Sequence, residues 1–104
     1  NLAGIDNVSL IQGRAGSTLA ALAARGETCD ALVVDPPRAG LESQLLAALP
    51  DLGPRLIVYV SCEPATLARD ARALAAAGYR LLRATPVDLF PHSYHIETVS
   101  VWSR

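Results

Sequence analysis

Cys62 has the residue type and the surroundings of a catalytic nucleophile. It follows an apolar run and precedes Pro64, a residue that favours the first turn of a helix. The N–H groups and the dipole of a helix N-terminus stabilise a thiolate, which is the nucleophilic form of cysteine. A free cysteine can equally be a small buried apolar residue. Both interpretations of Cys62 therefore stay open at this point.

Two carboxylates could act beside such a nucleophile. Asp35 ends an apolar run and is followed by Pro36 and Pro37, which make a stiff turn. Its carboxylate could accept a hydrogen bond from a ligand's amine or hydroxyl, or it could cap the turn. Glu97 lies within an expected strand, where a charged residue is rarely buried unless it is paired or functional. Glu97 is thus a candidate general base, or else a carboxylate on an exposed strand edge.

The other reactive or charged side chains give weaker signals. Arg38 could bind a phosphate, pair with Asp35 or be solvated. His92 and His95 are candidates for substrate contact or for orienting a neighbouring group. Cys29 has the position of a structural or incidental cysteine. Because the two cysteines are far apart and the two histidines have no further ligands beside them, we expect no metal site.

The elements that must position these residues alternate between strand-like and helix-like segments. Such alternation predicts an α/β fold with a mainly parallel sheet, whose functional residues lie at the carboxyl ends of the strands. Segment 56–60 is apolar throughout and should be covered on both faces. We expect Ser17 to cap the first helix and Pro50 to end the second. The expected strands are 8–11, 31–34, 56–60, 79–84 and 95–102, and the expected helices are 17–25, 41–49 and 64–77.

The composition indicates one domain or a piece of one. The chain has 104 residues, of which 51% are hydrophobic and 18% charged. Nine arginines against ten acidic residues give a net charge of −1, which does not attract nucleic acid by itself. No apolar run approaches the roughly 20 residues of a membrane span. With only two cysteines, we expect a reduced, cytoplasmic setting. The lack of any methionine suggests an excerpt from a longer chain.

Three blocks of the sequence together resemble the RNA (uracil-5-)-methyltransferases, which are class I enzymes that use S-adenosylmethionine. Residues 33–41 resemble the family's DPPRxG segment, residues 59–70 its nucleophile block, and residues 88–99 its block around the base. The three occur in the family's order and cover the chain from about Asn7 to its end. One departure is Glu63, which stands where the family usually has asparagine after the cysteine.

The resemblance implies a fold and a set of roles. Residues 1–104 would be the C-terminal part of a Rossmann-like catalytic domain with an antiparallel last strand, taken from a sheet of order 3-2-1-4-5-7-6. The glycine-rich turn that binds the donor would precede Asn1. Cys62 would add to carbon 6 of uracil, Glu97 would remove the proton from carbon 5, and Asp35 would contact S-adenosylmethionine. The substrate would be tRNA or rRNA, bound by the full-length enzyme.

Other interpretations and consequences follow from the same blocks. A cytosine-5 RNA methyltransferase also uses cysteine addition to carbon 6, although the segment from Pro91 to Glu97 favours uracil. The chain could also be a catalytically silent fragment or an RNA-binding module on a methyltransferase scaffold. By itself it should be inactive, and its exposed strand edges should favour self-association. No membrane partner is expected.

Overall fold

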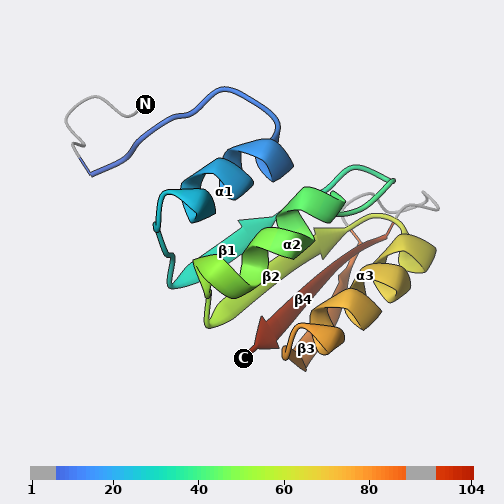
Figure 1. The fold of residues 1–104 in the computed structure, drawn as a ribbon. Coiled ribbons are helices and arrows are strands. Elements are labelled where there is room, and N and C mark those ends of the chain that lie inside the picture. Colours follow the sequence, from blue (N-terminus) through green and yellow to red (C-terminus); the bar gives the residue numbers. More distant parts are fainter. Residues whose placement is uncertain (1–6, 89–95) are drawn as a thin grey trace.

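The computed structural model describes residues 7–88 and 96–104. In these residues the chain forms three helices and four strands in two layers, with the helices packed on one face of a single sheet (Figure 1). The helices are α1 (Ala15–Ala24), α2 (Ser43–Leu52) and α3 (Pro64–Ala76), and the strands are β1 (Ala31–Val34), β2 (Leu56–Ser61), β3 (Arg80–Val87) and β4 (Glu97–Ser103).

The four strands form a mixed sheet in the order β1-β2-β4-β3. β1 pairs with β2 in parallel, while β4 lies antiparallel between β2 and β3. The predicted antiparallel last strand is therefore confirmed. The order matches the 4-5-7-6 part of the sheet that the resemblance implied. β4 runs antiparallel to both of its neighbours, β2 and β3. Only one of the three ladders is therefore parallel, so the sheet is mixed rather than mainly parallel.

The core lies between the sheet and the helices. Side chains alternate across a strand, so Ile57 and Tyr59 of β2 point to the same face as Trp102 of β4. These three side chains are 5% exposed or less, and they pack against Leu49 of α2 and Leu74 of α3, which are fully buried. The apolar positions of both helices thus bury one face of the sheet.

The opposite face of the sheet carries valines that no helix of the described residues covers. Val58 and Val60 of β2 are only half-buried, and Val33 of the edge strand β1 is 70% exposed. The expectation that segment 56–60 is covered on both faces is therefore wrong for this chain. Self-association through exposed strand edges stays a prediction.

The expected strand at 8–11 is absent, because these residues are irregular in the structure. Leu10 is 82% exposed and Ile11 is 59% exposed. An extended segment becomes a strand only when a neighbouring strand takes up its N–H and C=O groups. Within the described residues no sheet partner lies beside this segment. Its apolar pattern alone was therefore not sufficient.

The first helix starts earlier than predicted. α1 is preceded by Arg14 as its N-cap, and Ser17 lies inside the helix, where its hydroxyl donates to the Arg14 carbonyl at 3.2 Å. The capping group comes from another element, since the Gly16 N–H donates to Oε1 of Glu42 at 3.3 Å. Arg14 also lies 3.7 Å from Glu42 Oε2. A long-range carboxylate thus replaces the local cap that the sequence suggested.

Several other element ends move by a few residues. Pro50 does not end α2, because a proline in the last turn removes only one N–H bond, and the helix stops at Gly53 with φ of 63°. β3 continues through Pro86, which an edge strand tolerates. β2 includes Ser61, and β4 begins at Glu97 instead of His95, which lies outside the described residues.

Candidate functional site

Asp35, Cys62 and Glu97 lie at one edge of the sheet. Asp35 directly follows the carboxyl end of β1, and Cys62 directly follows that of β2. Glu97 is the first residue of β4, whose antiparallel direction brings its amino end to the same edge. Because β2 lies between β1 and β4, Cys62 occupies the middle position. The sheet therefore places all three predicted site residues at the same edge.

The strand register relates Cys62 to Glu97 more closely. The last pair of the β2–β4 ladder is Ser61 with Thr98. The next position in this register would place Cys62 opposite Glu97. Opposite residues of an antiparallel pair have Cβ atoms about 5 Å apart, and neighbouring strands are about 4.8 Å apart. A thiol and a carboxylate at this position could reach the same small planar ring.

The chain turns sharply at Cys62, which is exposed. The Glu63 N–H donates to Ser61 Oγ at 3.1 Å, and this hydroxyl lies at the same distance from the Glu63 carbonyl, to which it donates. The Glu63 carboxylate accepts from the Ala65 N–H at 3.4 Å and so caps α3. The departure at Glu63 is thus a helix cap, with its charge turned toward the N–H groups of α3.

Glu97 presents an unpaired oxygen. The residue is half-buried, and its Oε2 atom is shielded from solvent with no hydrogen-bond partner among the described residues. Buried polar atoms are nearly always paired, so an unpaired carboxylate oxygen needs an explanation. A proton on a bound substrate would satisfy it. This is what the structure adds to the sequence argument that Glu97 could act as a base.

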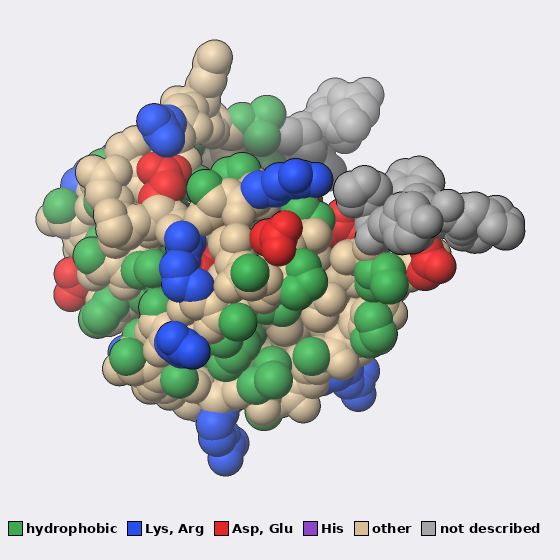
Figure 2. Space-filling model, turned by 90° about the vertical axis from the view of Figure 1, so that its right-hand side faces the viewer, with side chains coloured by type: hydrophobic (Ala, Val, Ile, Leu, Met, Phe, Trp, Pro, Cys, Tyr) green, Lys and Arg blue, Asp and Glu red, His purple; other side chains and the backbone are tan. Residues whose placement is uncertain are grey.

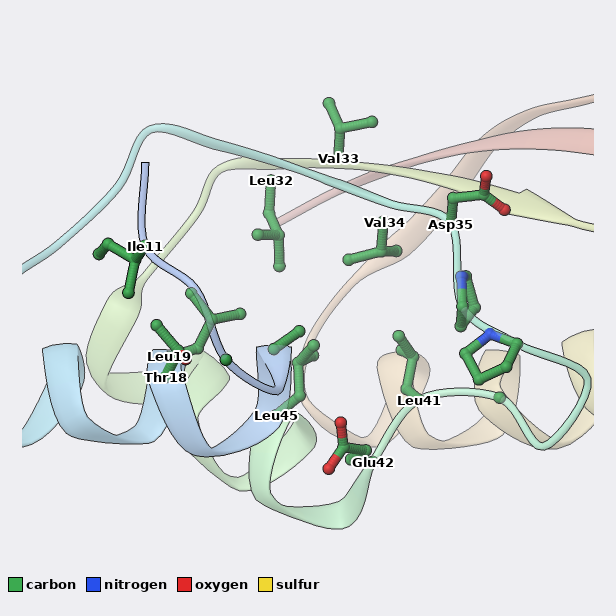
Figure 3. A pocket seen from close by; sticks show the side chains of 15 residues that line it. Ile11, Thr18, Leu19, Leu32, Val33, Val34, Asp35, Leu41, Glu42 and Leu45 are labelled. Carbon is green, nitrogen blue, oxygen red and sulfur yellow. The ribbon is translucent and has the colours of Figure 1, made fainter. Parts of the chain in front are cut away.

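A pocket of about 430 Å³ lies between β1, α1 and the start of α2. Figure 3 shows Leu32 and Val34 pointing from β1 toward the helices, while Val33 points away. Asp35 stands at the rim with its carboxylate directed away from Leu41 (Figure 3). The pocket therefore combines apolar walls with a carboxylate at its rim, and its volume suits part of a small-molecule ligand.

The segment that follows Asp35 is fastened to α3. The Thr66 hydroxyl donates to the Arg38 carbonyl at 2.7 Å, and an Arg69 Nη donates to the Ala39 carbonyl at 2.5 Å. Oδ2 of Asp70, a residue that is 1% exposed, accepts from the Leu41 N–H at 2.9 Å. Sequence reasoning missed these α3 residues. Asp70 is an acidic residue on the face of the predicted helix that should be buried, and this was the signal that could have revealed it.

Gly40 fits this attachment because it has no side chain. Its φ is +87°, and a Cβ built there would lie 2.6 Å from Asp70 Oδ2 and closer still to Arg69 and Thr66. Gly26 has a similar φ of +81° with open space around it. Gly26→Ala should therefore cost about 1 kcal/mol in left-handed backbone strain alone, whereas Gly40→Ala should cost roughly 1–3 kcal/mol more through overpacking.

Thermal denaturation of the two variants measures this difference. Each kcal/mol lowers the melting temperature by about 4–8 °C in a domain of this size. Equal melting temperatures for Gly40→Ala and Gly26→Ala would contradict the close packing of Gly40 against α3.

Tyr59 also binds the buried carboxylate. Its hydroxyl donates to Asp70 Oδ2 at 2.5 Å, and burial, followed by this hydrogen bond, raises the pKa of Tyr59 above its usual value of 10.0. The unfolded chain would ionise this tyrosine near pH 10, whereas the folded chain keeps the proton. The free energy of unfolding should therefore fall as pH rises above about 10, by up to about 1.4 kcal/mol per pH unit from this group.

Urea denaturation between pH 8 and 11 tests the alkaline loss of stability. Tyr59→Phe should reduce the slope, while the smaller contribution of Tyr79, whose pKa burial also raises, remains. An unchanged slope in Tyr59→Phe would show that the phenol ionises normally in the folded state.

Charged groups are dispersed over the surface. In Figure 2 the arginine side chains on the visible face stand apart from one another, and some of them lie beside acidic side chains. Arg38 is exposed and forms no ion pair within the part of the chain that the structure describes, so the predicted alternative of pairing with Asp35 is not observed. His92 lies outside the described residues, as does His95.

No group of three or more histidine, cysteine, aspartate or glutamate residues in the described part of the chain could hold a metal ion. None of the helices in residues 7–88 and 96–104 has the length and apolar character of a membrane span.

Comparison with known proteins gives one consistent family. A family profile described as "tRNA (Uracil-5-)-methyltransferase" matches residues 8–104. An uncharacterized RNA methyltransferase of Caldanaerobacter subterraneus is 45% identical over 101 residues, which make up 97% of this chain and 22% of that protein. One from Clostridium tetani is 46% identical over 95 residues, or 91% of this chain and 21% of that protein. The chain thus spans about a fifth of the length of the curated relatives it matches.

Two solved structures share the fold. The tRNA (uracil-54, C5)-methyltransferase of Pyrococcus abyssi, solved with S-adenosyl-L-homocysteine, matches with a TM-score of 0.66 and 43% identity. The match covers 73% of this chain and 19% of that one. M1.HpyAVI matches with a TM-score of 0.69 over 90% of this chain and 53% of its own, at 15% identity. At that identity, the second likeness concerns the fold alone.

Proposed function

We propose, for a chain that belongs to the tRNA (uracil-5-)-methyltransferase family, that it carries the catalytic residues of an enzyme that methylates carbon 5 of uracil in RNA. In this proposal Cys62 is the nucleophile and Glu97 is the base. The observation that carries it is the β2–β4 register, whose last pair is Ser61 with Thr98. Cys62 and Glu97 are the next residues of their segments at this edge of the sheet. A single pyrimidine ring could contact both side chains there.

The chemistry requires a thiolate and a carboxylate on the same ring. The Cys62 thiolate adds to carbon 6 of uracil, and the electron pair of the 5,6 double bond moves toward carbon 5. Carbon 5 then forms a bond to the methyl group, and the electron pair of the broken bond stays with the donor's sulfur. Glu97 takes the proton from carbon 5, the double bond forms again, and the bond between carbon 6 and Cys62 breaks.

The methyl donor of this proposal is S-adenosylmethionine, which when bound supplies a methyl group on a positively charged sulfur. The pocket of about 430 Å³ at the end of β1 fits part of such a molecule, with Asp35 as a hydrogen-bond acceptor at its rim. In support, the related Pyrococcus abyssi enzyme was solved with S-adenosyl-L-homocysteine. The sequence has no glycine-rich turn after a strand that could bind the rest of the donor.

The chain would thus be the C-terminal part of a longer catalytic domain. Its length is about a fifth of that of its relatives, and its sheet corresponds to the last four strands that the resemblance implied. The RNA substrate, tRNA or rRNA, would be selected mainly by other parts of the protein, because this chain has a net charge of −1. The cytoplasm, where such RNA is found, would be the site of action.

The test is an assay of the full-length protein with radiolabelled S-adenosylmethionine on unmodified RNA. Nuclease digestion and chromatography of the product should show 5-methyluridine. If 5-methylcytidine is the only methylated product, the enzyme acts on cytosine and the assignment of uracil as its substrate is wrong. If the protein is natively folded and no pyrimidine becomes labelled, the result would favour a catalytically silent domain.

A further inference from the structure

Asp70 holds together two parts of the proposed site without belonging to the reaction described above. Its carboxylate is 1% exposed, and both oxygens are hydrogen-bonded. Oδ2 accepts from the Leu41 N–H and the Tyr59 hydroxyl, while Oδ1 lies 3.2 Å from the guanidinium of Arg69. A buried carboxylate is costly unless it is fully paired, so this arrangement is strongly constrained.

The partners of Asp70 come from the two segments that carry Asp35 and Cys62. Leu41 ends the segment that follows Asp35. Tyr59 lies in β2, three residues before Cys62, and α3 itself begins two residues after Cys62. The Asp70 carboxylate therefore joins the segment that lines the pocket beside β1 to the two elements that flank Cys62. These elements are β2 and α3.

Further contacts with α3 hold residues 36–41 in place. The backbone carbonyls of Arg38 and Ala39 accept from side chains of α3, and Gly40 leaves no space for a side chain. A movement of residues 36–41 along α3 would break several of these hydrogen bonds at once. Within the part of the chain that the structure describes, the segment has one backbone hydrogen bond of its own, from the Gly40 N–H to the Pro37 carbonyl.

We propose that Asp70 is a positioning residue that fixes Asp35 relative to Cys62. This role rests on the proposed function, in which Asp35 contacts the methyl donor and Cys62 forms the bond to carbon 6 of uracil. A displacement of about 1 Å between two reacting groups can slow a reaction about 10²-fold. The attachment of the segment to α3 thus sets how well the donor's methyl group is aligned with carbon 5.

The test compares Asp70→Ala with Asp70→Asn in the full-length protein. The alanine variant leaves Leu41, Tyr59 and Arg69 without their acceptor, so kcat should fall about 10²-fold and the KM for S-adenosylmethionine should rise about 10-fold. The asparagine variant keeps an oxygen for Leu41 and Tyr59 and should recover at least about a tenth of the native kcat. Asp51→Ala, at an exposed position of α2, is the matched control.

A second readout separates positioning from general damage to the site. The rate at which iodoacetamide alkylates Cys62 should stay within about twofold in folded Asp70 variants, because their thiol and its turn are unchanged. If Asp70→Ala does not fold, Tyr59→Phe replaces it. Loss of one of the two donors to Oδ2 should then raise the KM for S-adenosylmethionine about threefold.

Three outcomes decide the matter. A folded Asp70→Ala protein with native kcat and native KM overturns the positioning role, even if its melting temperature falls. Equal loss in Asp70→Ala and Asp70→Asn, with slower alkylation of Cys62, also overturns it, because the nucleophile itself would then be disturbed. If the native protein forms no 5-methyluridine, the proposed function fails first and this role fails with it.

Discussion

Cys62→Ala in the full-length protein is expected to abolish methylation, with a loss of at least about 10⁴-fold in kcat. Alanine cannot add to carbon 6, and carbon 5 of uracil is too weak a nucleophile without that addition. The substitution should leave the fold intact, since Cys62 is exposed and lies after the end of β2. Methyl transfer from radiolabelled donor to RNA measures the loss.

Covalent trapping gives a more direct measurement of the same role. RNA that contains 5-fluorouracil should bind the native protein covalently in the presence of donor, because fluorine cannot leave carbon 5 as a cation. The adduct should be visible as a slower band in a denaturing gel. It should be absent from Cys62→Ala and present in Cys29→Ala, which removes the second cysteine of this chain. An adduct that survives in Cys62→Ala would assign the nucleophile to another residue.

Glu97→Gln should separate the two halves of the reaction. Glutamine has nearly the same shape but cannot take a proton from carbon 5, so turnover should fall about 10²- to 10⁴-fold. Addition of Cys62 and methyl transfer come before this step and should still occur. The variant should therefore accumulate a methylated covalent complex on ordinary uracil RNA, which mass spectrometry of the denatured complex can identify.

Glu63→Gln is the matched control for this experiment. Glu63 lies at the same edge of the sheet, but its carboxylate caps α3 by accepting from the Ala65 N–H, and a glutamine oxygen can do the same. We expect this variant to turn over within about tenfold of the native rate. Normal turnover in Glu97→Gln would refute its assignment as the base, whatever Glu63→Gln does.

Much of the fold was predictable because its signals are local. Segments 31–34 and 56–60 are short apolar runs between turn residues, and both are strands. Pro64 marks the start of α3 as expected. Residues 8–11 have a similar apolar pattern and form no strand, because strand formation needs a neighbour that the local sequence does not specify.

The candidate site was predictable only as a set of residue types. Asp35 and Cys62 stand after strand-like runs, and parallel strands bring such positions to one edge. The proximity of Glu97 depends on the antiparallel register of β4 with β2, which no local pattern encodes. An acid on the buried face of α3 could have indicated Asp70, but its partners Leu41 and Tyr59 are distant in the sequence and could not be predicted.

The position of β4 has a consequence for biosynthesis. A ribosome releases its product from the N-terminus at about 5–20 residues per second, so β2 and β3 emerge before the strand that separates them in the sheet. Until β4 inserts, β2 presents a valine-rich edge to which other nascent chains could bind.

Under the proposed function, the same order also links folding to the chemistry. Since β4 begins with Glu97, the strand that completes the sheet also delivers the proposed base. A product truncated before this residue would carry Cys62 without the group that releases it from a nucleotide. Such a product would also lack one of the two inner strands of the sheet, so the strand that completes the fold is also the one that allows release of the nucleotide.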